Sequence, residues 1–75
     1  MSNLANFSGK EIIKKLENQF GFEKVGQKGS HVKLRKKIDG SMVTVIVPRH
    51  SELAVGTLRN IIRQAEMTVE EFLQK

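Results

Sequence analysis

Cysteine, tryptophan and tyrosine are absent from this chain of 75 residues, and proline occurs once. Without cysteine the protein forms no disulfide bond and no thiolate–metal site, so a small hydrophobic core has to stabilise the fold alone. The absence also suits a reducing compartment. An exposed aromatic platform for stacking single-stranded bases is not indicated, because the four phenylalanines occupy positions that look like core or core edge. They are Phe7, Phe20, Phe22 and Phe72.

Long hydrophobic runs are also missing. No apolar stretch approaches the roughly 18 residues of a membrane span, and the N-terminus has no continuous apolar segment of the kind found in signal peptides. We therefore expect a cytoplasmic protein that does not enter a membrane. A chain of this length is expected to form one small domain, residues 1–75, with no room for a second core.

Negative charge is scarce, because 13 Lys and Arg side chains outnumber 8 Asp and Glu side chains and give a net charge of +5. This balance favours a polyanionic partner, which could be nucleic acid, an acidic protein or an anionic membrane surface. Membrane binding is disfavoured because the apolar faces of the expected helices are needed for the core.

Two capping boxes predict where helices begin. Ser8 to Glu11 opens the first helix, for which Gly21 is a plausible stop, and Thr68 to Glu71 opens a short last helix. Between them, apolar residues at i, i+3, i+4 and i+7 predict another helix. These apolar positions are Leu58, Ile61, Ile62 and Ala65.

Residues 22–27, 30–38 and 42–47 are predicted to be strands, with Lys28-Gly29 as the first turn and Asp39-Gly40 as a two-residue hairpin turn. The hairpin turn fixes the register of the last two strands. Ile38 then faces Ser41, Leu34 faces Val45 and Val32 faces Val47, and the aliphatic side chains of these pairs share one side of the sheet. The other side carries His31, Lys33 and Arg35, opposite Pro48, Ile46 and Thr44.

The predicted order is helix, three antiparallel strands, helix and short helix. Helices packed on one face of a three-stranded sheet make a two-layer α+β sandwich, and this is also the element order of a double-stranded-RNA-binding domain. Fold analogy alone does not give a function.

Several short motifs occur in a specific order: Gly29-Ser30-His31, Val47-Pro48-Arg49-His50, and Glu52 to Arg59. With these, the chain resembles the HicA-type mRNA interferase toxins of bacterial type II toxin–antitoxin systems from about Ser8 to Leu73. The resemblance implies a double-stranded-RNA-binding-like fold, metal-independent RNA cleavage and a neutralising HicB-type antitoxin. Carried over by position, His31 is the catalytic histidine. The chain departs from the family at Glu66, where the family often has Gly.

The chemistry of RNA cleavage suits these residues. The 2′-hydroxyl of RNA is the nucleophile, so an enzyme needs a proton acceptor and donor, and imidazole can be both near neutral pH. Lys33 and Arg35 share the face of His31 and could hold the phosphate. Lys28 and Ser30 are further candidates for contacting RNA, although for Ser30 a role as a turn residue is favoured. No cluster of carboxylates suggests a metal ion, and no cofactor is expected.

His50 has two readings. If the register continued past Pro48, His50 would share the sheet face of His31, and the two rings could divide the acid and base roles. Proline cannot donate to a strand ladder, however, so pairing should end near Pro48. A structural role for His50 in holding the following loop is therefore favoured.

Two other functions remain open on the sequence alone. The same fold and charge would suit a non-catalytic RNA-binding module, or a protein that docks an acidic partner. The pattern does not predict an oligomeric state.

Overall fold

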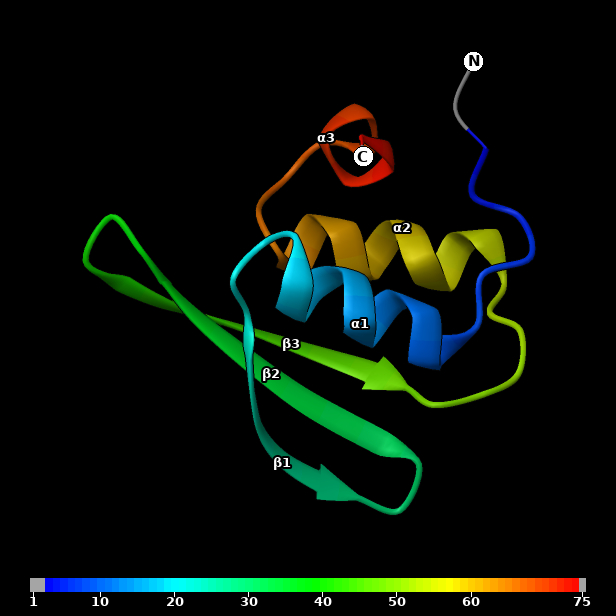
Figure 1. Cartoon of the computed structure of the whole chain (residues 1–75), viewed down its shortest axis with the longest axis horizontal. Coiled ribbons are helices and arrows are strands. Elements are labelled where there is room, and N and C mark those ends of the chain that lie inside the picture. The colour runs from blue at the N-terminus through cyan, green and yellow to red at the C-terminus, as the bar shows by residue number, and fades with distance from the viewer. Residues whose placement is uncertain (1–2, 75) are drawn as a thin grey trace.

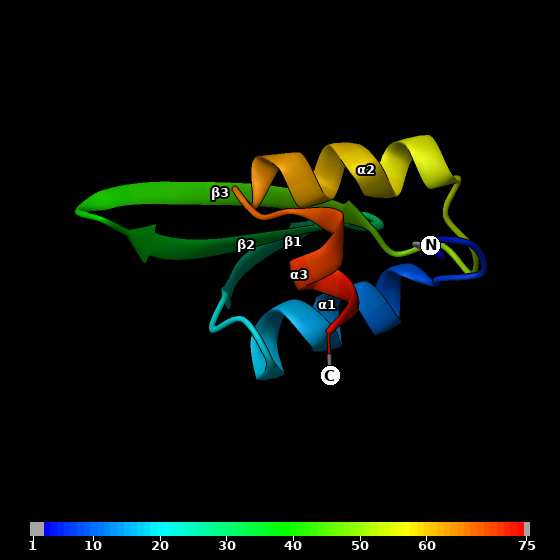
Figure 2. The same cartoon turned by 90° about the horizontal axis from the view of Figure 1, so that it is seen from above.

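The computed structural model describes residues 3–74. The elements follow the chain in the order α1 (Gly9–Asn18), β1 (Glu23–Lys28), β2 (His31–Ile38), β3 (Ser41–Pro48), α2 (Val55–Gln64) and α3 (Val69–Leu73) (Figure 1). The strands form one antiparallel sheet in the order β1-β2-β3. Helices α1 and α2 cover one face of the sheet, and α3 lies on the helical layer (Figures 1 and 2). The predicted two-layer α+β sandwich is confirmed.

Both predicted capping boxes are present. The Ser8 hydroxyl accepts a hydrogen bond from the Glu11 N–H at 3.1 Å, and the Glu11 carboxylate accepts one from the Ser8 N–H at 2.8 Å. Thr68 and Glu71 form the same reciprocal pair at the start of α3. Helix α1 ends at Asn18, before the expected stop. Gly21 has a φ of 76° and lies in the turn to β1.

The register of the β2–β3 hairpin is the predicted one, since all six expected pairs are observed. Asp39 and Gly40 have φ values of 50° and 81°, as a type I′ turn requires. The strands differ slightly from their predicted bounds. Lys28 belongs to β1 rather than to a turn, because it pairs with His31, so the turn falls on Gly29-Ser30. A β-bulge between Lys24 and Gly26 was not predicted.

The core lies between the sheet and the helices. It takes alternate residues of β2 and β3 and the apolar faces of the three helices. Its most deeply buried side chains are Phe72, Ile12, Leu16, Leu34, Leu58, Val32, Val45 and Val47. The other face of the sheet, which we call the outer face, has no helix on it among residues 3–74 (Figure 1). In the same residues, no helix is long and apolar enough to cross a bilayer.

Glu66 has a φ of 57°, in the left-handed region. It follows the C-terminal cap residue Ala65 of α2, where glycine is the preferred residue because it carries no Cβ. The departure from the family pattern noted in the sequence therefore places a strained residue at this turn.

Candidate functional site

His31 is the first residue of β2 and its side chain is exposed on the outer face. Its neighbour Val32 points the other way, into the core, and is only 1% exposed. Across the sheet His31 is flanked by Lys28 on β1 and Pro48 on β3. The imidazole is therefore open to solvent and accessible to a ligand.

Cationic side chains surround His31 on the outer face. Lys33 and Arg35 follow it along β2 at two-residue spacing and are both exposed. Lys28 lies directly beside it on β1. Since β-strands rise about 3.3 Å per residue, successive cations stand roughly 7 Å apart. Glu23, a carboxylate, lies opposite Arg35 on β1, whereas the residues next to His31 on this face include the cations Lys28 and Lys33.

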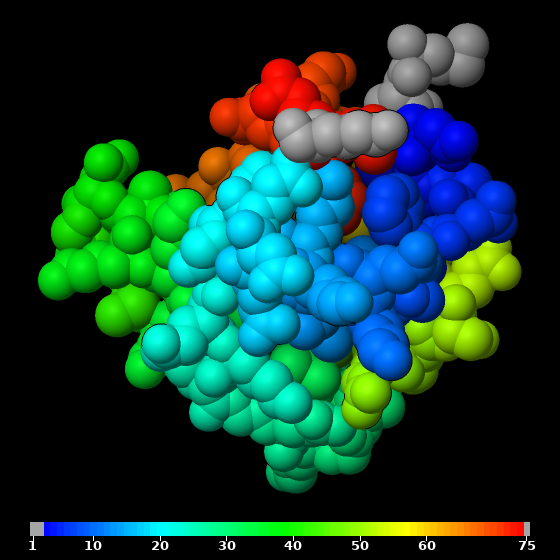
Figure 3. All heavy atoms as spheres, in the orientation of Figure 1, coloured from blue at the N-terminus to red at the C-terminus, as the bar shows by residue number. Residues whose placement is uncertain are grey.

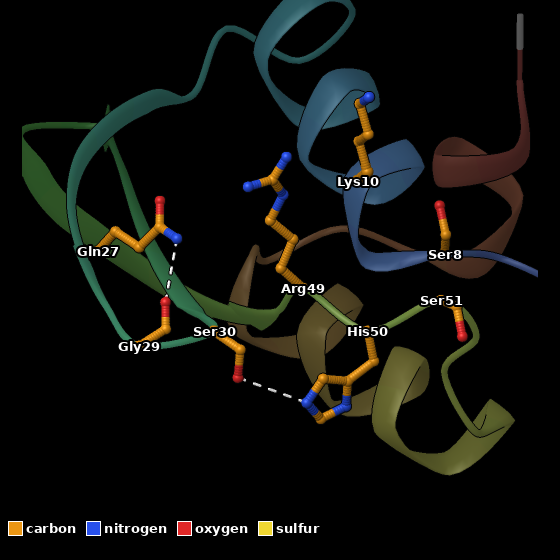
Figure 4. Close-up of a pocket in the computed structure, with 8 residues that line it drawn as sticks. All are labelled: Ser8, Lys10, Gln27, Gly29, Ser30, Arg49, His50 and Ser51. Carbon is orange, nitrogen blue, oxygen red and sulfur yellow. Dashed lines mark hydrogen bonds between the residues drawn. The ribbon is translucent and has the colours of Figure 1, made fainter.

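Ser30 and His50 belong to a different part of the surface. The Ser30 hydroxyl lies 3.5 Å from Nε2 of His50 (Figure 4). The carbonyl of Ser30 accepts a hydrogen bond from the Arg49 N–H at 2.6 Å, and that of His50 accepts one from the Gly9 N–H at 2.9 Å. The loop between β3 and α2 is thus tied to both the β1–β2 turn and the start of α1. Strand β3 ends at Pro48, as its missing N–H predicts.

These ties enclose an open hollow of about 720 Å³, which we call the loop hollow. It lies where the start of α1, the β1–β2 turn and the β3–α2 loop meet (Figure 4). Its lining consists of Ser8, Lys10, Gln27, Gly29, Ser30, Arg49, His50 and Ser51. Lys10 and Arg49 give this lining a positive charge, and none of the residues that line it is a carboxylate. His31 is not part of the lining.

The predicted site residues therefore fall into two adjacent groups. His31, Lys28, Lys33 and Arg35 share the outer face, whereas Ser30 and His50 line the loop hollow. Lys10 and Arg49 were not predicted as site residues. Arg49 stands inside the motif that ends β3, next to His50, and this position was the only signal that could have pointed to it.

The pKa of Glu11, in the capping box at the start of α1, lies below its ordinary value of 4.5. The backbone hydrogen bond from Ser8, and then the bond to the Ser8 side chain, lower the pKa of this carboxyl. The shift comes from the helix cap, so it does not by itself mark a catalytic acid. Within residues 3–74, no three His, Asp or Glu side chains are grouped so as to hold a metal ion.

Comparison with known families agrees with the resemblance seen in the sequence. A family model described as the HicA toxin of bacterial toxin–antitoxin systems matches residues 9–67, which is most of the chain. The matched range contains all the predicted site residues, together with Lys10 and Arg49. No curated protein matches the chain.

Proposed function

The chain belongs to the HicA toxin family of bacterial toxin–antitoxin systems, and from this premise we propose that it is an endoribonuclease that cleaves mRNA without a metal ion and uses His31 as its catalytic group. The observation that carries the proposal is the position of His31. Its imidazole is exposed on the outer face and flanked by Lys28 and Lys33, where a polyanion would bind.

The proposed reaction is a transesterification within the RNA. The 2′-oxygen forms a bond to the adjacent phosphorus, and the bond from that phosphorus to the 5′-oxygen breaks. The 2′-hydroxyl loses a proton as its oxygen attacks, and the leaving 5′-oxygen gains one. His31 carries out one of these two transfers, since imidazole can accept or donate a proton near neutral pH, and solvent water carries out the other. Lys33 and Arg35 lie along the same face and offset the negative charge that develops on the phosphate oxygens.

His50 is proposed to be structural. Its ring lies beside the Ser30 hydroxyl and its carbonyl holds the start of α1, so it ties three segments together. Its ring is part of the loop hollow, whereas His31 is on the outer face. This arrangement argues against an acid–base pair of the two histidines.

The proposed partner is a HicB-type antitoxin. A protein that covers the outer face would block both His31 and the cations that attract RNA. Binding of such a protein to the folded toxin alone would also stabilise this small domain by mass action.

The products of cleavage test this mechanism. Purified protein is incubated with a defined RNA in excess EDTA, and the ends of the fragments are identified by mass spectrometry. The proposal predicts cleavage in EDTA, with a 2′,3′-cyclic phosphate on one fragment and a 5′-hydroxyl on the other. Fragments with a 5′-phosphate, or cleavage that requires Mg²⁺, would contradict it. RNA that is bound and never cut would favour a non-catalytic RNA-binding module.

A further inference from the structure

The loop hollow meets a second depression, which runs between α1 and the strands. Lys10 and Arg49 line both. The second depression adds Lys14 and Lys24 and contains one carboxylate, Glu17. In the space-filling view, the segment around the β3–α2 loop reaches the surface between α1 and the strands (Figure 3). Positive charge from three different segments therefore converges beside Lys10 and Arg49.

We propose that Lys10 and Arg49 hold a backbone phosphate of the bound RNA, next to the phosphate that is cleaved. This inference rests on the proposed function, because it adds a second position for the same substrate. The sequence connects the two positions directly. Ser30 lines the loop hollow and His31 follows it on the outer face, with Cα atoms about 3.8 Å apart. An RNA strand whose cleaved phosphate lies at His31 can pass around the β1–β2 turn and place a neighbouring phosphate in the loop hollow.

The chemistry of the lining suits a phosphodiester. A guanidinium can bind two phosphate oxygens at once, and a lysine ammonium adds a mobile second charge. Lys10 supplies its group from α1 and Arg49 from the β3–α2 loop, and both side chains extend away from Ser30, whose hydroxyl faces His50 (Figure 4). None of the lining residues is a carboxylate that would compete for the cations.

The backbone holds the two cations in place. A Cβ on Gly9 would lie 2.1 Å from the Pro48 carbonyl oxygen and 2.7 Å from the Cα of Arg49, so only glycine allows α1 to begin against this loop. The Gly9 N–H then binds the His50 carbonyl, and the Arg49 N–H binds the Ser30 carbonyl. The backbones of Arg49 and of Lys10, which follows Gly9, are thereby held near each other although the two residues are distant in sequence.

Binding of RNA to a His31→Ala background tests the inference, since uncut RNA can be titrated whether or not the wild-type protein cleaves. Arg49→Gln and Lys10→Gln each remove one charge from an exposed side chain, so both variants should fold. Arg63→Gln removes the same charge at the opposite end of α2 and is the matched control. Dissociation constants are measured over a range of salt concentrations.

Each variant of the loop hollow should weaken binding of single-stranded RNA roughly 3- to 10-fold at low salt and reduce the slope of log K against log[salt] by about 0.7. Arg63→Gln should change both quantities clearly less. Equal effects of Arg49→Gln and Arg63→Gln would overturn the inference, because they would show a diffuse charge effect and no defined phosphate site.

Substrate length provides a second test in the active protein. A dinucleoside monophosphate has only the phosphate that is cleaved, so Arg49→Gln should lower its kcat/KM by a clearly smaller factor than that of a hexanucleotide. The same variant should raise KM for a hexanucleotide. An equal loss on both substrates would place Arg49 at the cleaved phosphate and contradict a second position. Absence of cleavage by the wild type would count against the proposed function, and the binding experiment would still decide the role of the loop hollow.

Discussion

Gly9 is the residue whose replacement the geometry restricts most severely. Its missing side chain leaves room for the backbone of Pro48 and Arg49, and neither can move away without disturbing β3 or the loop. Gly9→Ala should therefore destabilise the protein by about 1–3 kcal/mol, as overpacking does in buried sites. Urea denaturation would measure the loss.

Gly56→Ala is the control for Gly9→Ala. Gly56 lies in the first turn of α2, and nothing would meet its added Cβ within 4 Å. Alanine is a better helix former than glycine, so this variant should be neutral or more stable by up to about 1 kcal/mol. Equal destabilisation by both substitutions would contradict the close approach described for Gly9.

Glu66 offers a stabilising substitution. A non-glycine residue in the left-handed region, such as Glu66, destabilises the fold by about 1–2 kcal/mol. Replacement by glycine relieves this strain, but part of the gain in stability is lost because glycine is more flexible in the unfolded chain. Glu66→Gly should thus raise the free energy of unfolding by up to about 1 kcal/mol. Glu70→Gly, inside the helical first turn of α3, should lower it instead. A loss of stability in Glu66→Gly would show that the turn is not strained.

At the level of single residues, the sequence correctly predicted which side of the sheet a side chain occupies wherever apolar and polar residues alternate along a strand. His31, Lys33 and Arg35 lie on the outer face because Val32 and Leu34 between them are buried. Alternation does not extend into loops. Arg49 and Lys10 come together only through backbone hydrogen bonds between distant segments, and no local pattern predicts such bonds.

Among the elements, the start of α1 couples structure to pH. The pKa of Glu11 is lower in the folded state because the carboxylate accepts hydrogen bonds from Ser8. Because the pKa of Glu11 is lower in the folded state, its ionised carboxylate stabilises the fold at pH values above the ordinary pKa of 4.5. This stabilisation is lost as the pH falls through the pKa of the folded state. The free-energy difference between the wild type and Glu11→Gln should therefore be largest near neutral pH and shrink under acid conditions. Urea denaturation between pH 3 and pH 7 would measure it, and a difference that stays constant with pH would contradict this role.

The β2–β3 hairpin and β1 show why strands were not equally predictable. Asp39-Gly40 permits a two-residue turn, which sets Ile38 opposite Ser41. All other residue pairs between β2 and β3 follow from that first pair, so the sequence was enough to predict the register. All six residues of β1 are exposed and show no alternation of apolar and polar positions. Its bulge depends on pairing with β2, and the local sequence therefore did not predict it.

For the whole molecule, a net charge of +5 on 75 residues predicts that a polyanion stabilises the fold. A DNA oligonucleotide lacks the 2′-hydroxyl, so the proposed mechanism cannot cut it. At about 100 times its dissociation constant it should add about 2.7 kcal/mol, which corresponds to a rise in Tm of roughly 10–20 °C for a domain of this size. Differential scanning fluorimetry at low salt would detect the rise.

Salt dependence distinguishes phosphate contacts from other modes of binding. The rise in Tm should shrink strongly at 0.5 M salt, because binding through phosphates releases counterions. An uncharged analogue of the same base sequence is the control and should give little stabilisation. A rise that persists at 0.5 M salt would indicate that the basic outer face is not what binds nucleic acid.

The most direct measurement is the rate at which wild-type protein and His31→Ala cut the same RNA in EDTA, with the affinity of each for that RNA measured in parallel. The account predicts that the wild type cuts and that His31→Ala is about 10²- to 10⁴-fold slower, with affinity changed by no more than a few fold. A variant without the imidazole that cuts as fast as the wild type would contradict the assignment of His31.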